Sequence, residues 1–271
     1  MKKFLKKTVI SNIYHYIKKF VVKPKSQSNE SKIIKRIVNK FNIHNTFIEF
    51  GFSGWEFNCA DLANETGDEG NIKWSGLLID ADSYNIQIAN TIFHKNIVSK
   101  HMWLTLDTLE IFRNFKNEKK NIGILSLDID GNEYWFLEKL IDLRPDMIIC
   151  EFNIAFGLLT ISIPYHPNFD YTKEHEKWLY HGTSITALNY LCVKNGYSLV
   201  DISCNGVNAF FVRNDLLTPE TKKLVPEKIF KIKTYPDGST SAQNFELIKH
   251  MPYVDVTNSE SSSESMGKIL F

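Results

Sequence analysis

Short apolar runs alternate with amphipathic segments along the chain between residues 31 and 213. Apolar runs of the length of buried strands occupy 46–50, 74–80, 121–128 and 147–150, and a weaker one lies at 97–103. Apolar residues at helical spacing predict helices over 31–41, 55–65, 84–93, 132–143 and 184–194. Apolar strands that alternate with helices predict right-handed βαβ units, and therefore an α/β fold with a parallel sheet covered by helices on both faces.

The last third of this pattern is different. Two alternating runs, 197–202 and 208–213, flank Asn205-Gly206, a turn signal that predicts an antiparallel hairpin at the edge of the sheet. The stretch 154–180 holds prolines, histidines and aromatic residues without a clear period. It is longer than an ordinary connection between a strand and a helix, so we expect a lid or an acceptor-binding loop there.

The two ends of the chain have their own composition. Residues 1–29 contain eight lysines and no acid, and their apolar positions predict a basic amphipathic helix followed by a linker up to residue 30. Through residues 1–25 such a helix lies either on an anionic membrane surface or against the domain or a partner. The remainder is predicted to form one domain over 31–255 and a serine-rich flexible tail over 256–271.

Charge and cysteine usage exclude several classes of protein. The 32 Lys and Arg nearly balance the 31 Asp and Glu, so nucleic acid is not an expected partner. The four cysteines lie far apart without a C-x-x-C pair, which is typical of reduced thiols in a cytosolic protein. No apolar run approaches the roughly 20 residues of a membrane span. We therefore expect a cytoplasmic protein, at most peripheral to the inner face of a membrane.

Acidic residues stand at the carboxyl ends of four predicted strands: Glu49, Asp80 with Asp82, Asp128 with Asp130, and Glu151. In an open parallel sheet, ligands bind beyond this edge, near the point where the strand order reverses. A carboxylate at the end of the second strand can accept the hydroxyls of a ribose. Gly51 and Gly54, after the first strand, allow the backbone to approach a ligand closely.

The type of ligand follows from what this edge contains. It has neither a G-x-G-x-x-G run nor a phosphate-binding lysine, and an acid at the first strand tip repels a diphosphate. A ligand with a ribose and a cationic centre, such as S-adenosylmethionine, fits better than NAD or ATP. The predicted cofactor-binding residues are Glu49, Gly51, Gly54, Asp80, Asp82 and Asp128. The alternative for each acid is a helix N-cap, above all for Asp82.

Four segments in this order resemble FkbM-type S-adenosylmethionine-dependent methyltransferases: Phe47-Ile-Glu-Phe-Gly51, Gly76-Leu-Leu-Ile-Asp80, Leu104-Thr-Leu-Asp107 and Ser126-Leu-Asp-Ile-Asp-Gly-Asn-Glu133. The resemblance covers roughly 45–213 and implies a Rossmann-like class I methyltransferase sheet with an antiparallel edge. It also implies an O-methyltransferase that acts on a hydroxyl of a sugar in a surface glycan or of a small natural product. The sequence departs from the family at Ser126, where the family has Lys, and at Asp130, where it has Glu.

The segment Leu-Asp-Ile-Asp-Gly131 also resembles the metal-binding segment of macrocin-type sugar O-methyltransferases. That resemblance implies a divalent cation, Mg²⁺, held by Asp130, Glu151 and Asn153. Such an ion lowers the pKa of the acceptor hydroxyl. Two alternatives remain: one carboxylate is a direct general base, or the acids cap helices and pair with basic residues.

Further candidates for acceptor chemistry flank the irregular stretch. His166 and His181 are possible bases, and the predicted catalytic set is Asp130, Glu151 and His181. Tyr165 and Trp178 are candidates for a platform on which a sugar ring stacks. Asn132 and Glu133 either begin a helix or face the site. The competing classes are a nucleotide-sugar or NAD-binding enzyme and a non-catalytic partner protein that keeps the fold.

Overall fold

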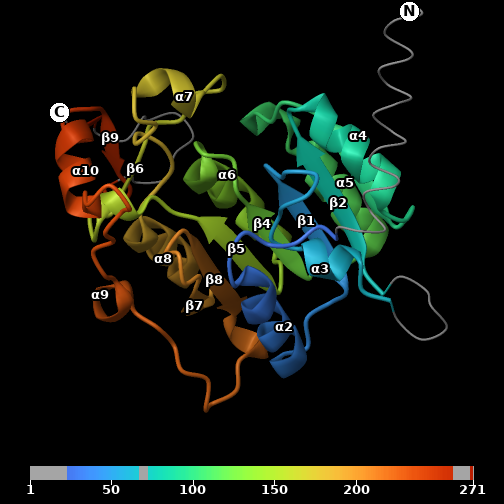
Figure 1. Ribbon diagram of the computed structural model, residues 1–271. Coiled ribbons are helices and arrows are strands. Elements are labelled where there is room, and N and C mark those ends of the chain that lie inside the picture. Colours follow the sequence, from blue (N-terminus) through green and yellow to red (C-terminus); the bar gives the residue numbers. More distant parts are fainter. Residues whose placement is uncertain (1–22, 67–72, 259–268, 271) are drawn as a thin grey trace, which may run out of the picture.

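A computed structural model describes residues 23–66, 73–258 and 269–270 of the chain (Figure 1). Its main sheet has seven strands in the order β3-β2-β1-β4-β5-β8-β7. The strands are β1 Thr46–Phe50, β2 Ser75–Asp80, β3 Ile97–His101, β4 Ile124–Leu127, β5 Met147–Glu151, β7 Tyr197–Ile202 and β8 Asn208–Arg213. Strands β1 to β5 are parallel, and β8 is antiparallel to both β5 and β7. The predicted α/β class, with a mostly parallel sheet and an antiparallel edge hairpin, is confirmed.

Helices cover both faces of this sheet because alternate strand residues bury on opposite sides. Phe47 packs with α2 (Glu30–Lys40), α3 (Ala60–Ala63) and α4 (Ser83–Ile92) on one face. Ile48 and Phe50 pack with α5 (Glu110–Lys119), α6 (Glu133–Leu140) and α8 (Ile185–Lys194) on the other. Short 3₁₀ helices are η2 Leu106–Thr108, η3 Ile141–Leu143, η4 Ile154–Phe156 and η5 Asn214–Leu216.

A second, three-stranded sheet lies beside the main one, and its strands come from distant parts of the chain. β6 (Ile161–Ser162) pairs with β9 (Tyr253–Asp255), which pairs with β10 (Ile269–Leu270). In Figure 1, β6 and β9 lie with α10 (Ser241–Ile248) at the end of the molecule opposite α4. A third apolar cluster, which includes Phe156, Ile163 and Tyr253, fills the space between them. α9 (Pro226–Ile229) connects this layer to the edge hairpin.

The stretch 154–180 is therefore more ordered than the sequence indicated. It contains η4, β6 and α7 (Tyr171–Glu174), and its apolar side chains pack against α10 and β9. Pairing between segments about ninety residues apart has no local period, which is why the pattern did not reveal it. The predicted helix at 55–65 is also too long, because only Ala60–Ala63 is helical. Residues before it form turns, and Lys25 bridges in parallel to Glu56.

The two predicted terminal segments are described only in part. The basic helix expected within residues 1–22 lies outside the described residues. Part of the expected linker packs on the domain, since Lys25 N–H donates to the carbonyl of Trp55 at 3.2 Å. In the predicted tail, Val256 is buried and Ile269–Leu270 pair with β9. Within the part of the chain that the structure describes, no helix has the length and apolar character needed to cross a membrane.

Candidate functional site

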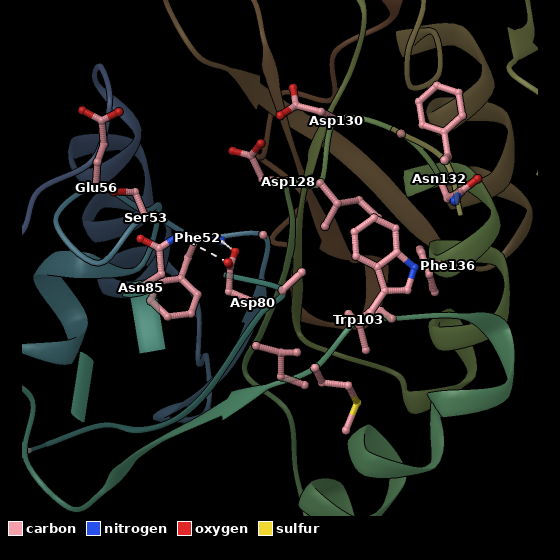
Figure 2. Close-up of a pocket in the computed structure, with 18 of the residues that line it drawn as sticks. Phe52, Ser53, Glu56, Asp80, Asn85, Trp103, Asp128, Asp130, Asn132 and Phe136 are labelled. Carbon is pink, nitrogen blue, oxygen red and sulfur yellow. Dashed lines mark hydrogen bonds between the residues drawn. The ribbon is translucent and has the colours of Figure 1, made fainter. Parts of the chain in front are cut away.

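A pocket of about 440 Å³ opens at the carboxyl ends of β1, β2 and β4 (Figure 2). The strand order reverses between β1 and β4, so the pocket lies where open α/β sheets bind ligands. The volume falls in the usual range for small-molecule sites. The pocket is lined by the loop after β1, the end of β2, residues 102–104 after β3, residues 128–132 after β4, and Pro167 and Phe169 from the 154–180 stretch.

The charged residues of the described pocket lining are all acidic. Among the described residues, four acids line the pocket, Glu56, Asp80, Asp128 and Asp130, and no lysine, arginine or histidine does. In Figure 2, Asp128 and Asp130 lie together on one side of the pocket, and Asp80 lies on another. A pocket with this lining favours a cationic ligand and disfavours a diphosphate.

Asp80 is held in a dense set of hydrogen bonds. Its Oδ2 accepts from the N–H of Phe52 at 3.0 Å. Its Oδ1 accepts from the N–H of Asp82 at 2.6 Å and from Nδ2 of Asn85 at 3.2 Å. Burial raises the pKa of Asp80, and these hydrogen bonds oppose that shift. A carboxylate has about four acceptor positions, so about one of them, on Oδ2, is left for a ligand.

Asn85 is a pocket residue that the sequence analysis missed. Its Oδ1 accepts from the N–H of Gly54 at 3.1 Å while its Nδ2 donates to Asp80, so it ties the loop after β1 to the end of β2. The available signal was its place three residues after Asp82, the N-cap of α4. Asp82 itself accepts from the N–H of Tyr84 at 2.8 Å and is not among the lining residues. The structure thus gives Asp82 the capping role that was its alternative.

The two glycines of the first turn have different roles. Gly51 has φ +74°, and a Cβ there would lie 1.6 Å from the backbone oxygen of Asp128. The loops after β1 and β4 therefore approach each other as closely as they do only because residue 51 is glycine. Gly54 does not line the pocket, and its Cβ would lie 2.6 Å from the Ile88 side chain. The prediction that Gly54 binds cofactor is not supported, because its small size serves packing against α4.

Glu49 does not face the pocket, which corrects the prediction of a cofactor contact. Its side chain is buried, and its two oxygens accept from the N–H groups of Asn58 at 2.7 Å and Cys59 at 2.8 Å. The alternation of β1 places Glu49 on the same face as Phe47, toward α3 rather than toward the strand tip. Burial raises the pKa of Glu49 to about 7, against the effect of these hydrogen bonds.

Ser126 also belongs to this buried group. FkbM-type enzymes, which the sequence resembles, have Lys at the matching position. It lies opposite Glu49 in the register of β1 and β4, and its Oγ accepts from Nδ2 of Asn58 at 3.1 Å. The hydrogen bonds that Glu49 and Ser126 accept hold the loop before α3 in position. Their contribution to the pocket is the position of the loop that forms its wall.

The loop after β4 is held in an unusual backbone conformation. Asp130 has φ +52°, a region that Asp tolerates better than most residues. Oε1 of Glu133 accepts from the N–H groups of Ile129 at 3.0 Å and Gly131 at 2.9 Å. These two hydrogen bonds hold the loop in position. The side chain of Glu133 is fully buried and does not line the pocket. Burial raises the pKa of Asp128 and Asp130, and in Asp128 the charge of Asp130 adds to this effect.

The three predicted catalytic residues lie together. Asp130, Glu151 and His181 each offer one ligand atom, and these atoms all lie within 4.8 Å of one another. Oε2 of Glu151 and Nδ1 of His181 are buried and have no hydrogen-bond partner among the described residues. Burial and the neighbouring acid Asp128 raise the pKa of Glu151, and burial lowers the pKa of His181 to about 4. At neutral pH the imidazole is therefore neutral and has a lone pair available.

Asn153 has a different role from the predicted metal ligand. Its Oδ1 accepts from the N–H of Ala155 at 3.0 Å. Its Nδ2 donates to the carbonyls of Leu179 at 2.8 Å and His181 at 3.0 Å, and its N–H donates to that of Thr183 at 2.8 Å. Asn153 therefore holds the segment that carries His181, and the imidazole occupies the place in the set that was predicted for the amide.

The remaining candidates, Tyr165, Asn132 and His166, either hold neighbouring segments together or lie at the surface. The N–H of Leu106 donates to the hydroxyl of Tyr165 at 3.1 Å, so Tyr165 fastens the 154–180 stretch to η2. Asn132 exchanges hydrogen bonds with the backbone of His166, and the exposed ring of His166 accepts from Asn168. His166 is not part of the set formed by Asp130, Glu151 and His181.

Aromatic rings adjoin His181. The Tyr171 ring lies 6.0 Å from the His181 ring and 6.2 Å from the Trp178 ring. Trp178 is 57% exposed and has φ +57°, a strained conformation for a bulky residue. The charges of Asp130 and Glu151 contribute to the raised pKa of Tyr171, as expected for a neighbour of both acids. Tyr171, which is half-buried, was missed because nothing in its local sequence distinguishes it from other tyrosines.

No protein-family model and no curated protein sequence matches the chain. A candidate O-methyltransferase from Klebsiella pneumoniae has a TM-score of 0.40 and 13% identity over 68% of this chain and 78% of the other. An O-methyltransferase from Bacillus cereus, solved in complex with SAH, has a TM-score of 0.37 and 17% identity over 67% of this chain and 76% of the other. Scores and identities this low carry no argument about chemistry, and membership of the FkbM-type family stays a prediction. The function has to be argued from the residues of this chain.

Proposed function

We propose that this protein is an S-adenosylmethionine-dependent O-methyltransferase. The observation that carries the proposal is the pocket at the switch point, whose lining, in the part of the chain that the structure describes, has four acids and no basic residue. S-adenosylmethionine has a ribose, a sulfonium and an ammonium group, so such a lining matches it. The diphosphate of NAD or of a nucleotide sugar would meet four carboxylates and no compensating cation.

The cofactor end of the pocket is provided by β1, β2 and the segment after β3. The free acceptor position on Asp80 Oδ2 suits a ribose hydroxyl, and Gly51, where the loops after β1 and β4 approach each other, also lines the pocket. Trp103, half exposed, lines the pocket, and its Nε1 donates to the carbonyl of Pro167 at 2.8 Å. This indole offers a flat apolar surface for the adenine ring.

The acceptor end adjoins the cofactor end through Asp130, which belongs both to the pocket lining and to the set with Glu151 and His181. S-adenosylmethionine supplies an activated methyl group, and transfer to an oxygen is an in-line displacement. The protein contributes position and a means to remove the acceptor proton. Either a neutral His181 accepts that proton directly, or a divalent cation such as Mg²⁺ on the carboxylates lowers the pKa of the hydroxyl.

A sugar hydroxyl is the acceptor class that we propose. Tyr171 and Trp178 form an aromatic wall beside His181, and aromatic faces bind the apolar faces of sugar rings. The FkbM-type resemblance points to the same acceptors, a surface glycan or a small natural product. Residues 1–25, with their lysines, would then contact the membrane surface on which lipid-linked glycans are assembled.

Calorimetry with the purified full chain tests the central claim. We expect S-adenosylmethionine and S-adenosylhomocysteine to bind with micromolar affinity, and NAD and UDP-sugars to give no heat. Binding of NAD or a UDP-sugar without S-adenosylmethionine would replace the proposal by a nucleotide-dependent enzyme. If none of these four ligands binds, the alternative interpretation, a non-catalytic partner protein, would be favoured.

A further inference from the structure

We propose that Asp130, Glu151 and His181 bind a divalent transition-metal ion, such as Mn²⁺ or Zn²⁺, beside the cofactor pocket. The binding of the ion stands on the geometry of these three residues alone. Its role, which is to hold and acidify an acceptor hydroxyl, rests on the proposed function.

The three side chains converge from separate parts of the fold. Glu151 ends β5, Asp130 lies in the loop after β4, and His181 lies in the segment before α8. Their ligand atoms all lie within 4.8 Å of one another. Oxygen and nitrogen ligands lie about 2.0 to 2.2 Å from such ions, so two ligand atoms of one ion are about 3 to 4.4 Å apart. Even at the upper limit of 4.8 Å, a shift of about 0.6 Å in each atom would bring all three to one ion.

Unsatisfied polar atoms point to a ligand at this place. Glu151 Oε2 and His181 Nδ1 are both buried without a hydrogen-bond partner among the described residues. A buried polar atom without a partner costs about 1 to 3 kcal/mol, and these two atoms belong to residues whose ligand atoms lie within 4.8 Å of one another. A metal ion would satisfy both atoms at once.

The surrounding charge also lacks a cation. Asp128, Asp130, Glu133 and Glu151 interact with one another, and none of them takes part in an ion pair with Lys or Arg within the described part of the chain. Buried like charges are unfavourable unless protons or a cation neutralise them. A divalent ion bound by Asp130, Glu151 and His181 would supply the missing cation.

Two buried residues keep the ligands in place. Asn153 donates to the carbonyl of His181, and Glu133 accepts from the N–H groups on either side of Asp130. Hydrogen bonds of this kind orient metal ligands in known sites. Asn153 and Glu133 are therefore positioning residues, and neither is proposed as a ligand.

The ligand types select the ion. Mg²⁺ prefers an all-oxygen set and keeps several waters, whereas an imidazole favours first-row transition ions. Two carboxylates and one imidazole therefore suit Mn²⁺, Fe²⁺, Co²⁺ or Zn²⁺ better than Mg²⁺. Three protein ligands leave coordination positions open, and two neighbouring hydroxyls of a sugar fit such positions. The acceptor class that follows is a vicinal diol.

Mn²⁺ is the probe for the test, because its free EPR signal disappears when it binds protein. We expect the tag-free full chain to bind about one Mn²⁺ with a Kd below 100 μM, without any cofactor present. Zn²⁺ should displace it, and Mg²⁺ should compete at least tenfold more weakly. Asp130→Asn and Glu151→Gln should each weaken Mn²⁺ binding at least tenfold.

His181→Gln tests the choice of ion. This variant should lose most of the preference for Mn²⁺ over Mg²⁺, while the matched control His166→Gln, at an exposed histidine outside the set, keeps it. Circular dichroism and S-adenosylmethionine calorimetry show whether each variant is folded. A free Mn²⁺ signal that persists with up to 1 mM protein, or wild-type binding by both Glu151→Gln and His181→Gln, would overturn the metal site. If the wild-type chain binds S-adenosylmethionine but not Mn²⁺, the metal site is wrong and the proposed function stands. If it binds Mn²⁺ but not S-adenosylmethionine, the proposed function is wrong and the metal site stands.

Discussion

The pocket and the adjoining set of Asp130, Glu151 and His181, which are the proposed cofactor and acceptor ends of the site, are built on opposite principles. At the cofactor end, Asp80 accepts three hydrogen bonds from the protein and the loops are locked by Asn85 and Gly51. At the acceptor end, Glu151 and His181 each keep a buried polar atom that has no partner among the residues the structure describes. The carboxylate of the first end is thus largely paired within the protein, whereas the second end offers two buried atoms that a ligand could satisfy. A polar group that a protein leaves unpaired in its interior is thus a better guide to chemistry than one it has fully satisfied.

The largest effect is expected from a change that closes the cofactor end. Gly51→Ala places a Cβ 1.6 Å from the carbonyl of Asp128 and requires a positive φ. We expect it to lower the free energy of unfolding by about 3 to 4 kcal/mol and to abolish cofactor binding. Gly157→Ala is the control, since it shares a positive φ but has nothing within 4 Å. It should cost about 1 kcal/mol, and equal losses in urea denaturation would contradict the close approach.

A change at the acceptor end should separate chemistry from cofactor binding. Glu151→Gln keeps the volume of the side chain and removes its charge. We expect kcat to fall about 100-fold, equivalent to about 2.7 kcal/mol, while the Kd for S-adenosylmethionine changes less than threefold. Single-turnover transfer of a labelled methyl group to a sugar acceptor measures the first quantity, and calorimetry measures the second. A parallel loss of cofactor affinity would show that the two ends are one site.

The buried Glu49 makes stability depend on pH. Its folded pKa, raised to about 7, lies above the ordinary value of 4.5, so the folded state binds more protons between these two pH values. Stability contributed by the protonated form is present below pH 4.5 and is lost as the pH rises through about 7, by about 2 kcal/mol from pH 5 to 8. Glu49→Gln should flatten this part of the urea-midpoint profile. Glu118→Gln, at an exposed position, should leave the profile as in the wild type.

The smallest effect distinguishes two neighbouring acids. Asp80→Asn should raise the Kd for S-adenosylmethionine about tenfold, because the amide cannot accept as many hydrogen bonds as the carboxylate. Asp82→Asn, at the N-cap of α4 outside the lining, should change that Kd less than twofold. Equal effects of the two variants would return Asp82 to the cofactor site.

The fold was largely predictable from local pattern. Buried parallel strands are nearly continuous apolar runs, and 46–50, 147–150 and the hairpin around Asn205-Gly206 appear at the predicted positions. The second sheet was not predictable, because β6 and β9 are short and pair across a long sequence separation. The helix at 55–65 was overestimated because the N–H groups of Asn58 and Cys59 donate to Glu49, in the preceding strand, instead of continuing a helix.

The candidate site shows the same division. Its position, at the carboxyl edge of the strands, and the acids Asp80, Asp130 and Glu151 followed from the sequence, because strand ends in a parallel sheet meet at one edge. Which of the acids face the pocket did not follow. Glu49 points toward α3 because of strand alternation, and Asp82 turns to cap α4.

The sequence by itself determined the α/β architecture, the edge of the sheet at which the pocket opens and the acidic character of that edge. Only the tertiary structure decided that His181, rather than Asn153, completes the set with Asp130 and Glu151. The physical reason is the distance along the sequence over which each signal acts. Alternation and turn signals act over a few residues. The three side chains come from β5, a loop and the segment before α8, and they meet only after the two sheets have packed.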